Sequence, residues 1–339
     1  MTNTPRVLGR LIVSSVNFIH QDEGIRMLFK QVSKVAQWGF VSVAVFSLMA
    51  CSPQGTAVQG GGEKIASEMP QTVNFGIIST ESSQNQKQSW TPLLADMSAA
   101  IGVEVKPFFA SDYAGVIQGM RFDKVDLAWF GNKSAMEAVD RANGEVFAQV
   151  VYDDGTTGYH SLLIAHKDSP ISSEKDMLAK ANELTFANGD PNSTSGNLVP
   201  GYYVFGKNNV QANQIFKRTV NANHESNAMA VANKQVDVGT FSNSNWLLMQ
   251  KKQPQIIDQL KVIWTSPTIE SDPLVLRKGL SPELQAKIKT FILGYGDTSE
   301  QKAVMATLGW SKFKASDNSQ LDSIRELEAF KQKQTQAAQ

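Results

Sequence analysis

The chain has 339 residues, of which 42% are hydrophobic and 9% aromatic, with 32 basic and 32 acidic side chains. This is an ordinary globular balance, long enough for about two domains of roughly 150 residues, and it excludes collagen-like, disordered and disulfide-framework proteins. A formal net charge of zero gives no electrostatic basis for binding nucleic acid, and the single cysteine, Cys51, excludes an internal disulfide and a multi-thiolate metal site.

Residues 1–50 have the features of a signal or targeting segment. The apolar run Trp38–Ala50 is 13 residues long, whereas a membrane-spanning helix needs about 20. It follows the basic residues Lys30 and Lys34, as the apolar core of a signal peptide does. Met27 begins a signal peptide of conventional length, so we expect translation to start there.

The apolar run ends in Leu-Met-Ala-Cys51, which resembles the processing site of bacterial lipoproteins, where the cysteine is lipidated and becomes the first mature residue. Residues 51–70 then form a polar, flexible linker, which argues against the alternative of a buried helix with an unreactive thiol. Without residues 1–50 the chain has 27 basic and 30 acidic residues, a net charge of −3. An anionic ligand must therefore be held by local donors.

From Val73 onward, short β-branched or aromatic runs alternate with amphipathic stretches, which predicts an α/β protein with repeated βα units on mainly parallel sheets. The predicted strands are Val73–Ile78, Glu104–Phe109, Val125–Trp129, Ser161–His166, Leu184–Ala187, Lys217–Val220, Val236–Thr240, Lys261–Trp264 and Leu274–Leu276. The predicted helices are Trp90–Ile101, Tyr113–Phe122, Ser134–Ala142, Ser173–Ala181, Asn197–Lys207, Glu225–Asn233, Pro282–Tyr295 and Glu300–Leu308.

A single gapless offset of 111 residues relates two parts of the chain at a first strand, a helix start and a later strand. It aligns Phe75 with Phe186, Tyr113 with His224, and Val125-Asp126 with Val236-Asp237. The identities are few, so chance is the alternative, but agreement at three elements favours two similar lobes. We expect the two aspartates, which lie within strands, to be structural.

The fold predicted from these features has two α/β lobes with a ligand cleft between them, lined by strand C-termini and helix N-termini. Lobe 1 takes residues 71–163 and 270–325, and lobe 2 takes residues 164–269. The strand at 161–166 is the predicted crossover, and residues 326–339 form a polar tail.

Three consecutive hydroxyl residues, Ser193, Thr194 and Ser195, precede an apolar helix pattern. Hydroxyls beside the free N–H groups and positive dipole end of a helix make an oxyanion site without a formal cation. Serine and threonine are also ordinary N-caps, so one of the three needs no functional explanation. Three in a row exceed what capping requires, and we favour an anion site.

Four further residues are cleft candidates. His224 opens a helix, and we expect its imidazolium to donate to the same anion with a pKa raised by the ligand, although a capping or surface role is the commoner use of such a histidine. Tyr113 holds the matching position in lobe 1. Tyr159 and Asp272 lie in polar loops near the predicted cleft.

Enzyme motifs are missing from the sequence: it has no nucleophile elbow, phosphate-binding P-loop or zinc-protease signature, so we expect no catalytic residue, cofactor or metal. A serine among Ser193–Ser195 with His224 as base would need an orienting carboxylate and an oxyanion hole, which the sequence does not identify. Binding is therefore the preferred interpretation.

Several long runs closely resemble the phosphonate-binding proteins of phosphonate/phosphite ABC transporters, over about residues 72–325. The resemblance implies a type II periplasmic-binding ("Venus flytrap") fold that closes on a small phosphonate or phosphite. It also implies delivery of that ligand, in the periplasm, to a membrane permease and through it to its ATPase. The runs that carry the resemblance are residues 74–82, 112–122, 134–144, 189–196 and 231–237.

The resemblance also implies roles for single residues. Tyr159 and Asp272 stand where members specific for aminoethylphosphonate surround the substituent, and Ser244 stands where those members have a second carboxylate. Phe130 and His160 replace an expected tyrosine and tryptophan. The positions that bind the phosphonate oxygens in the family are matched by Tyr113, Ser193, Thr194, Ser195 and His224.

A buried ammonium needs compensating charge, and Asp272 alone supplies less than a pair of carboxylates. We therefore expect aminoethylphosphonate to bind more weakly here than in the typical member, with methylphosphonate, phosphite or another small phosphonate preferred. Two other functions would use the same pocket: a ligand sensor that feeds a chemoreceptor, and a phosphonate-processing enzyme.

Overall fold

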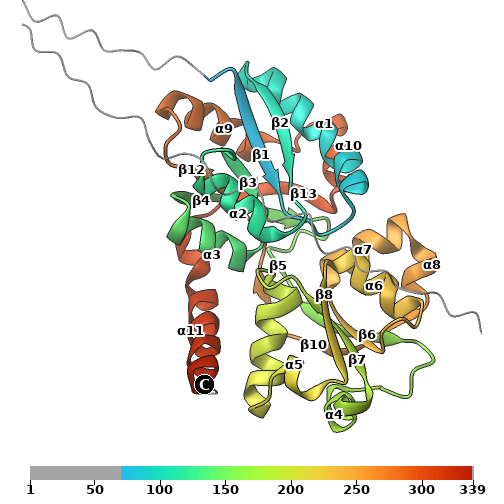
Figure 1. Ribbon diagram of the computed structural model, residues 1–339. Coiled ribbons are helices and arrows are strands. Elements are labelled where there is room, and N and C mark those ends of the chain that lie inside the picture. The colour runs from blue at the N-terminus through green and yellow to red at the C-terminus, as the bar shows by residue number, and fades with distance from the viewer. Residues whose placement is uncertain (1–69, 338–339) are drawn as a thin grey trace, which may run out of the picture. The chain divides into compact units, whose positions relative to one another are not determined.

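The computed structural model describes residues 70–337, which form two lobes, each built on one sheet with flanking helices (Figure 1). The predicted signal segment, Cys51 and nearly all of the predicted linker lie outside the described residues. Within residues 70–337, no helix is both long enough and apolar enough to cross a membrane.

Lobe 1 has a six-stranded sheet in the order β13-β4-β12-β3-β1-β2. Its strands are β1 (Thr72–Ile77), β2 (Glu104–Phe109), β3 (Leu127–Trp129), β4 (Gly144–Tyr152), β12 (Pro273–Arg277) and β13 (Trp310–Ala315). Its helices are α1 (Ser83–Ile101), α2 (Tyr113–Arg121), α3 (Asn132–Arg141), α9 (Pro282–Gly294), α10 (Ser299–Thr307), the 3₁₀ turn η5 (Asn318–Leu321) and α11 (Asp322–Ala337).

Lobe 2 has a five-stranded sheet in the order β10-β6-β9-β7-β8. Its strands are β6 (Ser161–His166), β7 (Thr185–Gly189), β8 (Arg218–Ala222), β9 (Val238–Ser242) and β10 (Leu260–Thr265). Its helices are α4 (Glu174–Ala179), η1 (Ala181–Glu183), the continuous helical segment η2 (Thr194–Leu198), η3 (Gly201–Phe205) and η4 (Gly206–Asn208), then α5 (Ala212–Ile215), α6 (His224–Ala232), α7 (Asn243–Lys252) and α8 (Pro254–Ile257).

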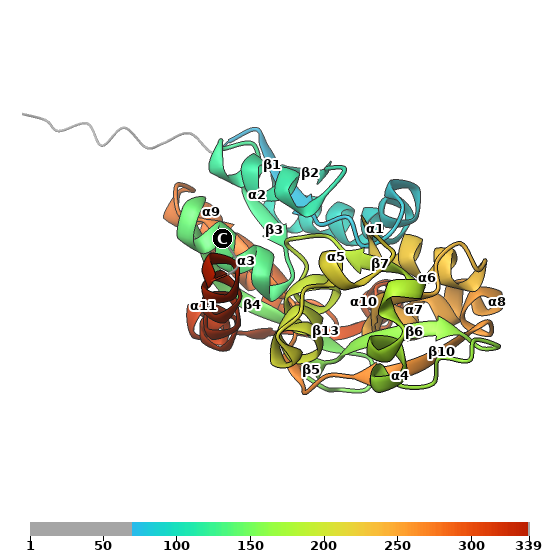
Figure 2. The same ribbon diagram turned by 60° about the horizontal axis from the view of Figure 1, so that its bottom comes forward.

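The sheet of lobe 2 is covered by helices on both faces (Figure 2), and the alternation of side chains along β6 explains how. Leu163 belongs to one buried cluster, which includes Met177 of α4. Leu162 and Ile164 belong to the other, which includes Val231 of α6. A strand that is apolar on both faces must be buried on both, as β6 is.

The predicted internal repeat is confirmed by the strand registers. In lobe 1, β1 pairs in parallel with β3, with Phe75 opposite Leu127. In lobe 2, β7 pairs in parallel with β9, with Phe186 opposite Val238, and both residues are shifted by 111 positions. Chance similarity of sequence would not reproduce the register of a strand pair.

The two strand aspartates also have matching structural roles, as predicted. Asp126 accepts a hydrogen bond from the backbone N–H of Asn74 at 3.0 Å, and Asp237 accepts one from the N–H of Thr185 at 2.7 Å. Asp126 is in addition buried and pairs with Arg277 at 2.7 Å. Each aspartate therefore ties its strand to the first strand of its own lobe.

The prediction of mainly parallel sheets is wrong. In lobe 1, β12 runs antiparallel to β3 and β4, and β13 runs antiparallel to β4. In lobe 2, β6 runs antiparallel to β9 and β10. The strands β6 and β12 are each the first strand after the chain crosses from the other lobe, so they enter their sheet against the direction of the βα repeat.

The lobe boundary predicted after residue 163 is also corrected, because all of β6 pairs within the sheet of lobe 2. The chain crosses just before Ser161, and the two crossing segments pair as the short antiparallel ribbon of β5 (Gly158–Tyr159) and β11 (Ile269–Glu270). Hydrogen bonding sets this position, and the apolar pattern of residues 161–166 does not reveal it.

Residues 326–337, predicted as part of a polar tail, belong to helix α11. Phe330 meets Tyr202 edge to face at 4.8 Å between ring centroids, and Lys331 Nζ donates to Asn197 Oδ1 at 3.0 Å. The sequence of α11 is largely polar, because much of its surface faces water. Its few contacts with lobe 2 come from single side chains that no local pattern marks.

Candidate functional site

Three helices that reach the cleft begin in the same way, with a capping residue followed by a predicted site residue. Asp112 accepts from Gly115 N at 2.8 Å and precedes Tyr113, the first residue of α2. Asn223 accepts from Ser226 N at 2.8 Å and precedes His224, the first residue of α6. In each case the cap fixes the helix start, so that the next side chain lies at the cleft.

The third such start is Ser193, which accepts from Gly196 N at 2.9 Å and precedes Thr194. One of the three predicted hydroxyls is thus a cap, as the ordinary alternative required. Ser195 Oγ lies 3.4 Å from His224 Nε2, and its carbonyl accepts from Ser161 Oγ at 2.6 Å. These contacts place the hydroxyl residues beside both the first strand of lobe 2 and the start of α6.

Thr194 has a partner in the other lobe. Helix α3 begins after Gly131, which has no side chain to cap it, and Thr194 Oγ1 accepts the N–H of Lys133 at 2.8 Å. A Cβ atom at Gly131 would lie 3.1 Å from the Thr194 hydroxyl oxygen, so the absence of a side chain permits this approach. The hydroxyl of lobe 2 thereby caps a helix of lobe 1.

All eight residues predicted to contact ligand line one cavity of about 20 Å³ between the lobes. The structure adds residues that sequence reasoning did not single out, among them Thr80, Gly131 and Asn245. The eight predicted residues are Tyr113, Tyr159, Ser193, Thr194, Ser195, His224, Ser244 and Asp272.

Each of the added residues lies within two positions of a polar strand end. Thr80 belongs to the polar segment after β1, while Gly131 and Asn245 flank the paired residues Asn132 and Asn243. Those asparagines, which the offset of 111 residues relates, hold the crossing segments: Asn132 Nδ2 donates to the Glu270 carbonyl at 2.7 Å, and Asn243 Oδ1 accepts from the N–H of His160 at 2.7 Å. The internal repeat therefore indicated the region of the ligand cavity but did not identify which residues line it.

The environment of His224 acts against the charge expected for this side chain. The side chain is buried, and burial lowers the pKa of His224 to about 4, so the ring is neutral at pH 7 in this structure. Its Nδ1 atom is buried without a hydrogen-bond partner among the described residues. The cavity by itself thus offers a neutral imidazole, and the imidazolium expected in contact with an anion stays a prediction.

Two buried tyrosines are neutral donors at the cavity. Burial, with a smaller effect of the nearby Asp272 carboxyl, raises the pKa of Tyr113 and of Tyr159 well above the usual range of a phenol. Both hydroxyls therefore keep their protons at any physiological pH. With the hydroxyls of lobe 2, they provide O–H donors that need no formal charge.

Asp272 is the ionisable acid of the cavity. Burial raises the pKa of the Asp272 carboxyl to about 7, while a hydrogen bond from Tyr159 acts in the opposite direction. One of its oxygens, Oδ1, is buried without a partner among the described residues. A carboxyl in this state is suited to a donor or a cation brought by a ligand.

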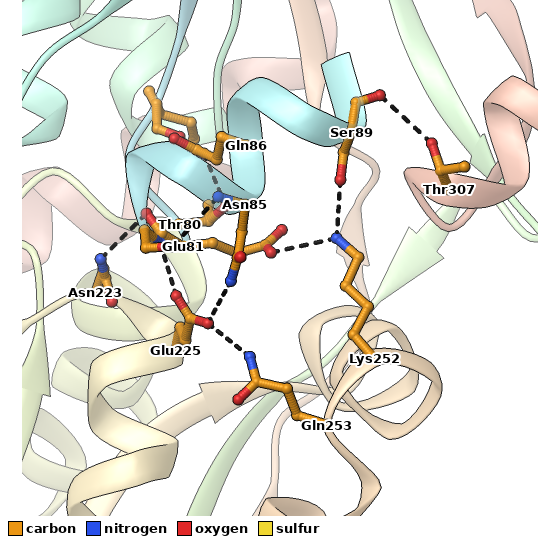
Figure 3. A network of polar contacts seen from close by, with 12 residues as sticks. Thr80, Glu81, Asn85, Gln86, Ser89, Asn223, Glu225, Lys252, Gln253 and Thr307 are labelled. Atoms are coloured by element: carbon orange, nitrogen blue, oxygen red, sulfur yellow. Dashed lines mark hydrogen bonds and ion pairs between the residues drawn. The ribbon is translucent and has the colours of Figure 1, made fainter. Parts of the chain in front are cut away.

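A network of polar contacts joins the lobes beside the cavity (Figure 3). Glu225 accepts from Ser82 N at 2.6 Å and from Asn85 Nδ2 at 2.7 Å, both in lobe 1. Lys252 Nζ of α7 lies 3.3 Å from Glu81 Oε2, across the same boundary. Because Glu225 follows His224 directly, the start of α6 serves both the cavity and the contact between lobes.

On the other side of the cavity, Asp190 Oδ2 of lobe 2 accepts the N–H of Tyr113 at 3.2 Å. With Glu225 and Thr194, this makes three oxygens of lobe 2 that satisfy N–H groups at the starts of α1, α2 and α3. Such contacts form only when the lobes are together, so the structure is that of a closed cleft.

The two sheets, the two crossing segments and the cavity enclosed between the lobes define a solute-binding protein of the type II periplasmic class. The family described as "ABC transporter, phosphonate, periplasmic substrate-binding protein" matches residues 75–321, and the chain belongs to this family. It is therefore a periplasmic substrate-binding component of a phosphonate ABC transporter, and the prediction of a binding protein rather than an enzyme is confirmed.

Relatives and solved structures agree with this assignment. The "Phosphonates-binding periplasmic protein" of Escherichia coli K12 is 60% identical over 269 residues, which are 79% of each chain. A binding-protein component of an ABC phosphonate transporter from Pseudomonas aeruginosa is 62% identical, with a TM-score of 0.77 over 79% of this chain and 89% of that one. A Prochlorococcus marinus protein in complex with methylphosphonate, 23% identical, has the same fold, with a TM-score of 0.69 over 76% and 97% of the two chains.

Proposed function

We propose that this chain binds the oxygens of a phosphonate with neutral donors at capped helix starts, and that the closed cleft presents the ligand to the permease. The residues that would bind these oxygens are Tyr113, Ser193, Thr194, Ser195 and His224. The observation that carries the proposal is their convergence on one buried cavity whose lining contains no lysine or arginine among the described residues. Oxyanions are held in this way by hydroxyls and helix N–H groups.

A second set of residues would surround the substituent on phosphorus. Tyr159, Ser244 and Asp272 line the same cavity, and Asp272 supplies a single carboxyl there. Ser244 is partnered by Ser242, with 3.0 Å between the hydroxyl oxygens, and contributes no charge. We therefore propose that aminoethylphosphonate binds this chain more weakly than it binds relatives with two carboxylates at these positions.

A thermal-shift panel tests the ligand class, because a tight ligand raises the apparent stability of the folded state. Methylphosphonate, aminoethylphosphonate, phosphite and phosphate are compared, and calorimetry then gives the affinity of each one that shifts the transition. We expect phosphonates to raise the melting temperature more than phosphate. Sub-micromolar affinity for aminoethylphosphonate, with none for the smaller anions, would contradict the assignment of the substituent side.

We also propose that Cys51 is the lipid attachment site and that the permease couples the protein to an ATPase. Support comes from the Leu-Met-Ala-Cys51 sequence at the end of the apolar run and from the transporter family. Metabolic labelling with a radioactive fatty acid tests the anchor: the wild-type protein should take up label and fractionate with membranes. A Cys51→Ser variant that is labelled equally would contradict the anchor and leave the ligand assignment intact.

A further inference from the structure

The ligand cavity lies beside a second, larger one, with which it shares lining residues. Four residues line both cavities and so form their junction: Thr80, Ser244, Asn245 and Asp272. The second cavity has a volume of about 40 Å³, compared with about 20 Å³ for the first. The side of the site away from the oxyanion donors is thus more spacious than a hydrogen atom or a methyl group on phosphorus requires.

Aromatic rings wall the second cavity. Trp90, Trp129 and Trp310 all line it, and their ring centroids lie 5.4 to 5.5 Å from one another. Tyr152 lines it too. Tryptophan faces attract cations, and they do so more strongly where water is excluded.

The polar groups of the second cavity are acids and one unused donor. Glu81 lines this cavity and not the first, and its Oε2 atom lies 3.3 Å from Lys252 Nζ (Figure 3). The indole Nε1 of Trp129 is buried without a partner in the described part of the chain. With Asp272 at the junction, two carboxyls face a ligand that is itself an anion.

Charge balance therefore favours a ligand that brings its own cation. No lysine or arginine lines either cavity among residues 70–337, although Lys252 pairs with Glu81 from outside the lining. A simple alkyl anion would leave Asp272 Oδ1 without a partner, whereas an ammonium group between Asp272 and Glu81 would pair with the first and share the second with Lys252.

We propose that the second cavity binds the cationic end of an aminoalkyl substituent longer than two carbons, with Asp272 at the junction and Glu81 at the far end. The inference rests on the proposed function and specifies its substrate class. Ser244 is the position that allows it: its short hydroxyl leaves the junction open, where a carboxylate would hold an ammonium before it reached the aromatic walls. Glu81 thus supplies the second carboxyl that position 244 lacks, at a greater distance from phosphorus.

Calorimetry with matched ligands tests the proposal. In the wild-type protein, 3-aminopropylphosphonate should bind at least about tenfold more tightly than propylphosphonate, and about fivefold more tightly than aminoethylphosphonate, because only the first carries an ammonium group as far as Glu81 and the rings. In Glu81→Gln the advantage of aminopropyl over propyl should fall below about threefold. Ser244→Glu should restore preference for aminoethylphosphonate.

Glu81 also pairs with Lys252 across the cleft, so its substitution can weaken closure on any ligand. The affinity of each variant for the aminoalkyl ligands is therefore divided by its own affinity for methylphosphonate. Lys252→Met is the matched control: it removes the same ion pair but keeps the carboxyl, and it should retain the aminopropyl preference. Propylphosphonate binding as tightly as aminopropylphosphonate, with methylphosphonate still bound, would overturn this inference alone. Failure of every phosphonate to bind would overturn the proposed function together with it.

Discussion

At the starts of α1, α2 and α3, lobe 1 offers backbone N–H groups to the cleft, whereas lobe 2 offers side-chain oxygens to them. The donors at these three starts are Ser82 N, Tyr113 N and Lys133 N. Their acceptors in lobe 2 are Glu225, Asp190 and Thr194. The two lobes repeat the same strand registers, but they have diverged into complementary halves of one interface.

The difference shows how closure and anion binding are related. A helix start that is incompletely capped within its own lobe, as α3 is, can be satisfied by a hydroxyl of the other lobe or by a ligand oxygen. The contacts that close the cleft and the contacts to a ligand therefore use the same kind of donor, an N–H group at a helix start. A ligand that supplies oxygens to both lobes stabilises the closed state that it contacts.

The largest effect is expected on the free energy of unfolding, when the aspartate that the two lobes share is removed from each lobe in turn. Asp126→Ala removes a buried strand contact and leaves Arg277 without its 2.7 Å partner, which should lower the free energy of unfolding by about 3 kcal/mol. Asp237→Ala removes an exposed contact and should cost about 1 kcal/mol. Urea unfolding measures both. Equal losses of unfolding free energy in the two variants would mean that the aspartate contributes equally to both lobes. As a control, ligand affinity should change in neither variant.

The next effect concerns the donors of lobe 2. His224→Ala and Thr194→Val should each lower phosphonate affinity by at least about tenfold without unfolding the protein, because each removes a polar group at the cavity. Thr194→Val keeps the shape and also removes the cap on Lys133. Calorimetry gives the affinity, and circular dichroism checks the fold. Near-unchanged affinity in both variants would refute the placement of the ligand.

Local signals in the sequence predicted the three capped helix starts at the cleft, whereas α1 begins at Ser83, well before the predicted Trp90. The caps Asp112, Ser193 and Asn223 act within three residues, so the pattern around them placed α2, the η2 segment and α6 to within three residues. The antiparallel entry of β6 and β12 depends on pairing with distant strands, which apolar patterning does not encode.

The neutral state of His224 and the role of Glu225 could not be predicted from the sequence, because both depend on tertiary contacts. Burial sets the first, and the second depends on Ser82, which is 143 residues away in the chain. Local motifs and the internal repeat indicated seven of the eight predicted cavity residues, and the resemblance to a family added Ser244. The structure supplied the contacts that join the lobes around them.

A smaller effect, on the rate of ligand dissociation, should distinguish a residue that closes the cleft from one that contacts the ligand. Glu225→Gln weakens a charged acceptor that does not line the cavity, so it should raise the ligand dissociation rate by about fivefold and leave association nearly unchanged. Stopped-flow fluorescence measures both rates. Glu183→Gln, at an exposed position of lobe 2, is the control and should change neither. An equal change in the control would show that the effect is one of net charge.

The smallest expected effect uses the two buried titratable groups, which shift in opposite directions. The pKa of Asp272 is raised to about 7 from 3.8, so the folded state loses stability as pH rises from about 4 to 7. The pKa of His224 is lowered to about 4 from 6.5, so the folded state gains stability between about pH 4 and 6.5. The phenols of Tyr113, Tyr152 and Tyr159 face Asp272 and stay neutral throughout.

Asp272→Asn should therefore melt about 2 °C above the wild-type protein at pH 8 and level with it at pH 4, since only the wild-type chain buries an ionised carboxylate at the higher pH. His224→Gln should show the opposite pattern, with its advantage at pH 4 and none above about pH 6.5. Melting curves across this range, without ligand, measure both. Parallel curves for Asp272→Asn and the wild type would mean that the carboxyl titrates in its ordinary range, and the cleft would then present a full negative charge to the ligand at neutral pH.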